Sequence, residues 1–314
     1  MKRDLLINGS LAVTSLLIFT LAIEYGLRVT GLQTVEPNPP KIYVRDENPH
    51  ISYKLKPNLK DEPAYKATVS TDEFGMRESG NQLNVNSQLL TVILGDSIAF
   101  GYGVNDNETL ASQLSVLSSQ LFINAAVPGY QLEQERALYE DYVQDLKPDA
   151  VMIVFFWNDL DGLKPGILDD DGILRGYGWK PGDDTRPWLE RHSAFYKAFR
   201  KLMSLRASKK HQEHEREHAK EERVSRDTLE KYVQDLRAFA TILPQEKFFV
   251  IWPDNFLHED TKPILTSEAK AAGFTVIDLY ELFGNHVETL GWDTVHPSLN
   301  SIKQAADFIA KQIW

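Results

Sequence analysis

Apolar residues in the second part of the chain gather in five short runs. Each run is four to eight residues long and rich in β-branched or aromatic side chains, which is typical of strands buried on both faces of a sheet. The runs are Leu89 to Leu94, Leu121 to Val127, Ala150 to Trp157, Phe248 to Trp252 and Phe274 to Ile277.

Helical patterns separate these runs. Leu110, Leu114 and Leu117 mark one helix face, and a second helical stretch that begins near Leu132 ends at Pro148. The last residues place apolar side chains at helical spacing from Ile302 to Ile313, which predicts a closing amphipathic helix. This alternation predicts an α/β fold, a three-layer α/β/α sandwich around a central five-stranded parallel sheet.

The amino terminus has a different pattern. Leu5 to Ile23 form a run of nineteen uncharged residues, preceded by Lys2 and Arg3 and followed by Glu24. At about 1.5 Å per residue, such a helix nearly crosses a bilayer core of about 30 Å. We expect residues 1–30 to be an uncleaved single-pass anchor that crosses the membrane through residues 5–23. A cleaved signal peptide and a buried core helix are the alternatives.

The basic residues before this run predict its orientation. Lys2 and Arg3 favour a cytoplasmic amino terminus, so the rest of the chain is expected on the far side of the inner or cytoplasmic membrane. There it would be periplasmic or exposed at the cell surface.

Two further segments differ from the strand and helix alternation. Residues 31–88 contain prolines such as Pro37 and little periodicity, which predicts a linker and an irregular lead-in without chemistry. Residues 89–314 are expected to form the main folded domain. Its longest interruption, residues 160–246, is strongly charged and is expected to be a helical, solvent-facing insertion.

Composition excludes several classes of function. The chain has 34 Lys and Arg against 45 Asp and Glu, a net charge of −11 that repels phosphate backbones, so nucleic acid is not expected as a partner. It has no cysteine, which excludes disulfides, thiolate metal sites and a cysteine nucleophile.

A candidate nucleophile follows the first apolar run. Ser97, in the sequence Gly95-Asp96-Ser97, would lie at the carboxyl end of a parallel strand, where open α/β sheets bind their ligands. A serine hydroxyl needs a base, and the base needs a carboxylate to orient it. Asp293 and His296 supply both, because a three-residue spacing lets the carboxylate reach the ring Nδ1.

Attack on an ester carbonyl also requires donors for the developing oxyanion. Gly129 follows the second run, where the absence of a Cβ lets its N–H approach a ligand. Asn158 follows the third run and offers a side-chain NH₂.

These blocks resemble a known family. Ser97, Gly129, Asn158 and His296, in this order, are similar to the four blocks of the SGNH hydrolases, the GDSL-type esterases and lipases, over roughly residues 90 to 314. The resemblance implies that Ser97 is the nucleophile, His296 the base and Asp293 its partner. It also implies an oxyanion hole made by the Ser97 N–H, the Gly129 N–H and Asn158, and no metal or organic cofactor.

The chain departs from the family pattern at two positions. Phe156 stands where the third block usually has glycine, and Ser301 stands where a glycine often follows the His-Pro pair. Phe156 is expected to narrow or reshape the acyl pocket.

Two other motifs are present. The segment from His214 to His218 matches the H-E-x-x-H zinc pattern, but its surroundings are almost entirely charged, which favours a solvated helix. Gly101-Tyr102-Gly103 resembles the start of a dinucleotide fingerprint but lacks its third glycine.

The sequence therefore predicts a membrane-anchored serine esterase that removes acyl groups, and the expected substrates are O-acetyl groups on cell-envelope carbohydrate. Three alternatives remain open. The enzyme would be an O-acetyltransferase if it passed the acyl group to polysaccharide beside a membrane acyltransferase or acyl carrier. It would be a lysophospholipase or another lipid esterase if it took lipid esters, or a non-catalytic carbohydrate-binding or assembly subunit if the serine were inactive.

Overall fold

The computed structural model describes residues 2–33, 39–79, 89–118, 120–160, 166–176, 178–180, 186–218 and 224–313. The chain forms two compact units. One unit comprises residues 1–38 and 180–210, and the other comprises residues 39–179 and 211–314. The second unit contains the sheet and all the predicted site residues.

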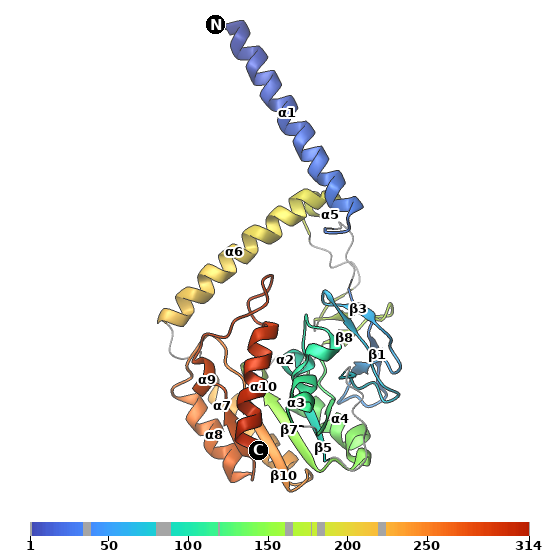
Figure 1. The fold of residues 1–314 in the computed structure, drawn as a ribbon, viewed down its shortest axis with the longest axis vertical. Coiled ribbons are helices and arrows are strands. Elements are labelled where there is room, and N and C mark those ends of the chain that lie inside the picture. Colours follow the sequence, from blue (N-terminus) through green and yellow to red (C-terminus); the bar gives the residue numbers. More distant parts are fainter. Residues whose placement is uncertain are drawn as a thin grey trace. The chain divides into compact units, whose positions relative to one another are not determined.

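The central sheet is parallel throughout, with the strand order β11-β10-β7-β5-β6 (Figure 1). Its strands are β5 (Leu90–Gly95), β6 (Leu121–Asn124), β7 (Ala150–Phe155), β10 (Glu246–Ile251) and β11 (Thr275–Asp278). Each overlaps one of the five apolar runs, so the predicted sheet is confirmed. All six residues of the central strand β7 are buried, as expected for a strand covered on both faces.

Helices cover both faces of this sheet and confirm the three-layer architecture. α3 (Leu110–Ser118) packs against α10 (Leu299–Ile313), and α7 (Arg226–Ala240) packs against α4 (Leu132–Leu138) and α8 (Thr261–Ala271). Shorter helical elements are α2 (Ser97–Phe100), α5 (Trp188–His192), α9 (Tyr280–Phe283), η1 (Asp106–Glu108), η2 (Tyr139–Val143), η3 (Gln144–Leu146) and η4 (Trp157–Leu160).

The predicted insertion differs from the structure in its extent. Residues 160–246 were expected to face solvent, but α7 buries Leu229, Tyr232, Leu236 and Phe239. Their helical spacing makes an apolar stripe, so α7 is the crossover helix between β7 and β10 and belongs to the core. The charged part is confined to earlier residues, which include the short hairpin β8 (Ile167–Leu168) and β9 (Leu174–Arg175), α5 and α6 (Ala194–His218). Residues 161–165, 177, 181–185 and 219–223 lie outside the described residues.

The expected linker also differs from the structure. Residues 39–79, named the lead-in below, form two antiparallel hairpins, β1 (Tyr43–Arg45) with β2 (Tyr53–Leu55) and β3 (Glu62–Ala64) with β4 (Ala67–Val69). Their buried apolar side chains join the main hydrophobic core. Three-residue strands are too short for a period to be visible in the sequence, which explains the wrong expectation. Residues 34–38 and 80–88 of that segment lie outside the described residues.

The amino-terminal helix α1 (Lys2–Val29) carries the uncharged run. Its residues Leu6–Val29 are long and apolar enough to cross a membrane, a property that membrane anchors and signal sequences share. Most of its large apolar side chains are exposed.

Candidate active site

The backbone around Ser97 leaves little freedom. β5 ends at Gly95, where φ is +149° and a Cβ would lie 2.7 Å from the Ala99 Cβ and 2.9 Å from the Val154 oxygen. Only glycine fits this turn. Asp96 then caps α2 by accepting a hydrogen bond from the Ile98 N–H at 2.8 Å, so its carboxylate serves as a turn acceptor. Ser97 is thereby held at the first residue of α2.

The three residues predicted to act together are hydrogen-bonded in a chain. His296 Nε2 lies 3.0 Å from Ser97 Oγ, and His296 Nδ1 lies 3.0 Å from Asp293 Oδ2. Ser97 and His296 are 199 positions apart in the sequence. The fold thus brings a hydroxyl, an imidazole and a carboxylate into the order that general-base activation requires.

The Asp293 carboxylate is fixed by its own loop. Its Oδ1 accepts hydrogen bonds from the backbone N–H groups of Val295 at 2.6 Å and His296 at 2.8 Å. Burial raises the pKa of Asp293, but the hydrogen bonds from the His296 ring and these N–H groups outweigh it and lower the pKa to about 2. Asp293 is therefore ionised at neutral pH and favours a proton on His296 Nδ1, which leaves Nε2 to face Ser97.

Two other strand ends hold the predicted oxyanion donors. Gly129 has a φ of +82°, and its N–H has no hydrogen-bond acceptor among the described residues. Asn158, in η4, donates from Nδ2 to Asp96 Oδ2 at 2.8 Å, so one amide hydrogen orients the side chain and the other is left for a ligand. Burial raises the pKa of Asp96, while the hydrogen bonds from Ile98 and Asn158 oppose that rise.

Aromatic side chains support the base. The ring of Tyr102 stacks on the His296 ring, with centroids 3.8 Å apart and an interplanar angle of 16°. Tyr65, from the lead-in, packs on the ring of Tyr102, with the two ring centroids 4.1 Å apart. Tyr65 and its neighbour Lys66 both have positive φ, at 53° and 65°, in the two-residue turn between β3 and β4. Such a turn favours Asn or Gly, so the side chain at this position is held under backbone strain.

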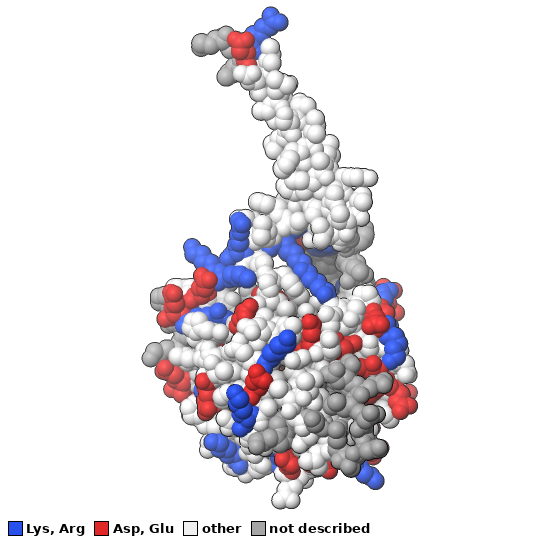
Figure 2. Space-filling model, in the orientation of Figure 1, with Lys and Arg blue, Asp and Glu red and all other residues white. Residues whose placement is uncertain are grey.

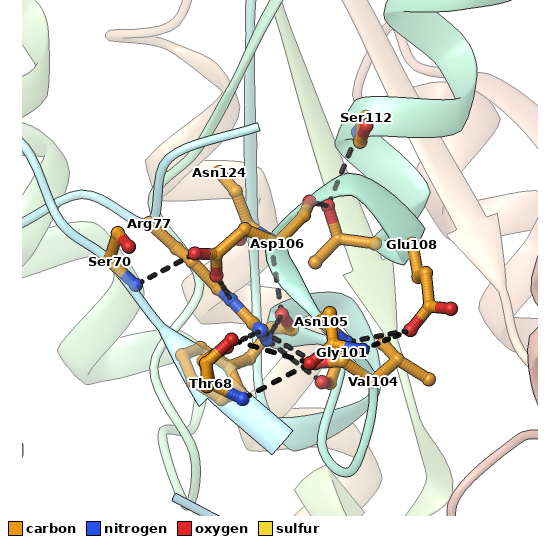
Figure 3. A network of polar contacts seen from close by, with 12 residues as sticks. Thr68, Ser70, Arg77, Gly101, Val104, Asn105, Asp106, Glu108, Ser112 and Asn124 are labelled. Atoms are coloured by element: carbon orange, nitrogen blue, oxygen red, sulfur yellow. Dashed lines mark hydrogen bonds and ion pairs between the residues drawn. The ribbon is translucent and has the colours of Figure 1, made fainter. Parts of the chain in front are cut away.

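Arg77, at the end of the lead-in, binds the turn that follows α2 (Figure 3). Its side chain is fully buried and pairs with Asp106 through Nε at 2.9 Å. The same guanidinium donates to the backbone oxygens of Phe100, Gly101 and Val104 at 2.6 to 2.9 Å. The carbonyl groups at the end of a helix lack hydrogen-bond donors within the helix. At the end of α2, the Arg77 guanidinium provides these donors.

Tyr53 supports the loop of the second block. Its hydroxyl donates to the Pro128 oxygen at 2.9 Å, and its backbone oxygen accepts a hydrogen bond from the Tyr130 hydroxyl. A Cβ on Gly129 would lie 2.9 Å from the Tyr53 hydroxyl oxygen. No sequence motif marks Tyr53, Tyr65 or Arg77, because these residues act through backbone carbonyls and ring faces and belong to no recognisable sequence block.

A buried carboxyl group lies behind the site. Glu135, in α4, is 1% exposed, and burial together with the charge of Asp96 raises its pKa to about 8. It is therefore largely protonated at neutral pH. No sequence signal marks it, since it occupies an ordinary position in a helical stretch.

A pocket of about 270 Å³ adjoins Asn158. Polar and apolar side chains share its lining, which comes from four segments: Phe156, Trp157, Asn158, Gln212, Arg216, Pro253, Asp254, Asn255, Val287, Thr289, Thr294 and Val295. Phe156, the residue in place of the family glycine, thus borders this pocket. A second pocket, of about 470 Å³, is lined by residues such as His50 and Glu133 and contains none of the predicted site residues.

The discounted motifs have other surroundings. His214 is exposed, and Glu215 accepts a hydrogen bond from Asn255 at 3.3 Å. Within the described ranges, no three His, Cys, Asp or Glu side chains are grouped to hold a metal ion. Ser301 is buried in α10 and donates to the Glu288 oxygen at 2.8 Å, so it serves the fold.

One comparison with known proteins identifies a family. A family model described as the GDSL-like Lipase/Acylhydrolase family matches residues 93–300, the segment that contains every predicted site residue. No curated protein matches the chain in sequence.

Solved structures with a similar fold include a protein assigned to the G-D-S-L lipolytic family from Desulfitobacterium hafniense DCB-2. It is 15% identical, with a TM-score of 0.45, over 72% of this chain and 99% of that one. A variant of Axe2, an acetyl xylan esterase from Geobacillus stearothermophilus, is 15% identical, with a TM-score of 0.42, over 73% of this chain and 96% of that one.

Proposed function

Because the chain belongs to the GDSL-like lipase/acylhydrolase family, we propose that it is a serine esterase that works through Ser97, His296 and Asp293. One observation carries this proposal. The Ser97 hydroxyl, the His296 ring and the Asp293 carboxylate form a continuous hydrogen-bonded chain with both distances at 3.0 Å. An ordinary strand-to-helix turn has no need of an imidazole that is itself oriented by an ionised carboxylate.

The reaction follows from this geometry. The Ser97 oxygen attacks the ester carbonyl carbon while His296 Nε2 takes the hydroxyl proton. The carbonyl oxygen becomes an oxyanion that accepts hydrogen bonds from the Ser97 and Gly129 N–H groups and from the Asn158 amide. When the tetrahedral intermediate collapses, His296 returns the proton to the leaving alcohol and the acyl group stays on Ser97.

The second half repeats these steps with water. His296 takes a proton from a water molecule, whose oxygen attacks the acyl-enzyme carbonyl. Collapse of this intermediate releases the carboxylic acid and returns the proton to Ser97. Asp293 keeps its negative charge throughout and stabilises the imidazolium that forms twice in the cycle.

We propose O-acetyl groups on cell-envelope carbohydrate as the substrate. The pocket beside Asn158 supports this choice, because a volume of about 270 Å³ suits a small acyl group better than a long acyl chain. Polar side chains in its lining, among them Gln212, Arg216 and Asn255, can bind sugar hydroxyl groups. The apolar helix α1 supports an anchor at the membrane, with Lys2 and Arg3 on the cytoplasmic side and the catalytic unit in the envelope.

Replacing the nucleophile tests the activity. Ser97→Ala should lower kcat for p-nitrophenyl acetate by about 10⁴-fold or more, because the attacking atom is lost. Ser267→Ala, an exposed serine on α8, is the matched control and should keep full activity. Equal rates for Ser97→Ala and the unaltered enzyme, with both folded by circular dichroism, would exclude Ser97 as the nucleophile.

A panel of p-nitrophenyl esters from acetyl to palmitoyl tests the substrate class separately. We expect kcat/KM to be highest for acetyl and to fall with chain length. A preference for palmitoyl would overturn the carbohydrate-ester assignment and leave the Ser97 result intact.

A further inference from the structure

We propose that α5 and the first part of α6, residues 188–210, form a helical segment that lies on the surface of an anionic lipid bilayer. This segment is called the surface helix below. The inference rests on the proposed membrane anchor and adds a second contact with the same membrane.

The charge of this segment is opposite to that of the chain. Residues 188–210 contain seven basic residues and one acidic residue, a net charge of +6 in a chain whose net charge is −11. Figure 2 shows blue side chains gathered over α6, next to the uncharged length of α1. The basic residues are Arg191, Lys197, Arg200, Lys201, Arg206, Lys209 and Lys210, and the acidic residue is Glu190. Each basic residue near an anionic membrane surface contributes about 1 kcal/mol to binding.

An apolar face accompanies this charge. Phe195, Phe199, Leu202 and Met203 follow the i, i+4, i+7, i+8 pattern of one helix face. Phe199, Leu202 and Met203 are 46 to 52% exposed, and Trp188 in α5 is 63% exposed. Lys197, Arg200 and Lys201 occupy the other side of the same turns. A basic face opposite an exposed apolar face with aromatic residues is the pattern of interfacial membrane helices.

Hydrogen bonds place the start of α6 at the end of the uncharged run of α1 (Figure 1). The Glu24 carboxylate accepts from the Ser193 hydroxyl and from the Ala194 and Phe195 N–H groups at 2.8 to 2.9 Å. Arg28 donates to the His192 oxygen at 2.6 Å. Glu24 is the first charged residue after the nineteen-residue apolar run, so it marks the level at which α1 would leave the bilayer.

These contacts favour a lipid occupant of the apolar face. When α1 crosses a membrane, the start of α6 is held at the lipid headgroups, where an exposed Trp and a Phe-Leu-Met face can enter the acyl boundary. The basic residues on the other side can then bind lipid phosphates and neighbouring headgroups.

The absence of cysteine makes a clean test possible. Single-cysteine variants of the full chain, Met203→Cys on the apolar face and Ser204→Cys on the adjacent polar side, would carry a nitroxide label. Leu16→Cys would report on α1. The labelled proteins are placed in vesicles of phosphatidylcholine and phosphatidylglycerol in equal amounts, and power saturation measures the access of oxygen and of a water-soluble nickel chelate.

We expect the chelate to reach the Met203→Cys label several-fold less than the Ser204→Cys label, and this difference to shrink in vesicles of phosphatidylcholine alone. Unchanged hydrolysis of p-nitrophenyl acetate shows that each labelled protein is folded. Equal access at both positions, with the Leu16→Cys label protected, would overturn the surface helix and keep the anchor. Free access to the Leu16→Cys label would overturn both. Equal protection at both positions in neutral vesicles would mean that protein covers α6, which also overturns the proposal.

Discussion

Two regions of the catalytic unit contribute to the site in opposite ways. The loops at the carboxyl edge of the sheet carry all of the proposed reacting groups, from Ser97 to His296. The lead-in, residues 39–79, carries none of them, yet it contacts three of the structures that hold those groups. Tyr53 contacts the Gly129 loop, Tyr65 packs on Tyr102 beside His296, and Arg77 binds the end of α2.

The two regions thus have different roles: the sheet-edge loops carry the reacting groups, and the lead-in holds those groups in position. A reacting group must be one of a few residue types, so the sheet-edge loops have recognisable motifs. A supporting residue needs only a donor or a ring of suitable size at the right point in space, and many sequences can supply one. The lead-in is therefore as much a part of the site as the loops, although its sequence resembles a linker.

Among the substitutions that test this difference, we expect the largest loss of activity from one in the sheet-edge loops. Asn158→Ala removes a proposed oxyanion donor and should lower kcat by about 10²- to 10³-fold with little change in KM, because the lost hydrogen bond forms mainly in the transition state. Steady-state hydrolysis of p-nitrophenyl acetate measures it. Asn300→Ala, exposed at the start of α10, is the control. A loss of less than tenfold would mean that Asn158 does not stabilise the oxyanion.

In the lead-in, Arg77 should affect stability more than any other residue. Arg77→Met leaves Asp106 and the carbonyls of Phe100, Gly101 and Val104 without their donor, and should lower the free energy of unfolding by about 3 to 5 kcal/mol. Urea denaturation measures this change. Arg77→Lys should recover only part of the loss, since one ammonium group cannot reach acceptors spread around a planar guanidinium. A loss below about 1 kcal/mol would mean that water replaces the guanidinium at these carbonyls.

The same contrast explains what the sequence could predict. The five apolar runs determined the sheet, because a strand buried on both faces must be apolar along its whole length. Ser97, Gly129, Asn158, Asp293 and His296 were found by their order and by their places after strands. Strands of three residues have too few positions to display a period, so the sequence pattern does not predict the two hairpins of the lead-in. The apolar stripe of α7 is visible in the sequence. The strongly charged residues before α7 made the whole interval look solvent-facing, so the start of this buried helix was not predicted.

Glu135 belongs to neither region, and its titration makes the free energy of unfolding depend on pH. Its pKa is 4.5 in a solvated side chain and about 8 in the folded protein. Between these values the unfolded chain loses a proton that the folded chain keeps, so stability falls as pH rises and levels off above about 8. Glu135→Gln should reduce this fall, to which Glu135 contributes at most about 1.4 kcal/mol per pH unit. Urea denaturation from pH 4 to 9 would reveal it, with exposed Glu133→Gln as the control. Parallel curves for Glu135→Gln and the unaltered protein would show that Glu135 ionises normally.

The smallest expected loss of kcat tests most directly whether the lead-in helps to position His296. Tyr65 packs on Tyr102, and Tyr102 stacks on His296, so we expect Tyr65 to act on the base through the Tyr102 ring. An aromatic pair is worth about 0.5 to 1.5 kcal/mol, so Tyr65→Leu should lower kcat by about two- to tenfold and leave KM unchanged.

Tyr65→Phe separates the ring from the hydroxyl. It keeps the ring against Tyr102 and removes only the hydrogen bond between the Tyr43 and Tyr65 hydroxyls, so it should retain full kcat with a modest loss of stability. If Tyr65→Leu loses stability by a similar amount but keeps the kcat of the unaltered enzyme, the lead-in supports the fold alone, and His296 is held by its own loop and Asp293. If kcat falls for Tyr65→Leu and not for Tyr65→Phe, the position of the base depends on a stack of rings that begins outside the family's motifs.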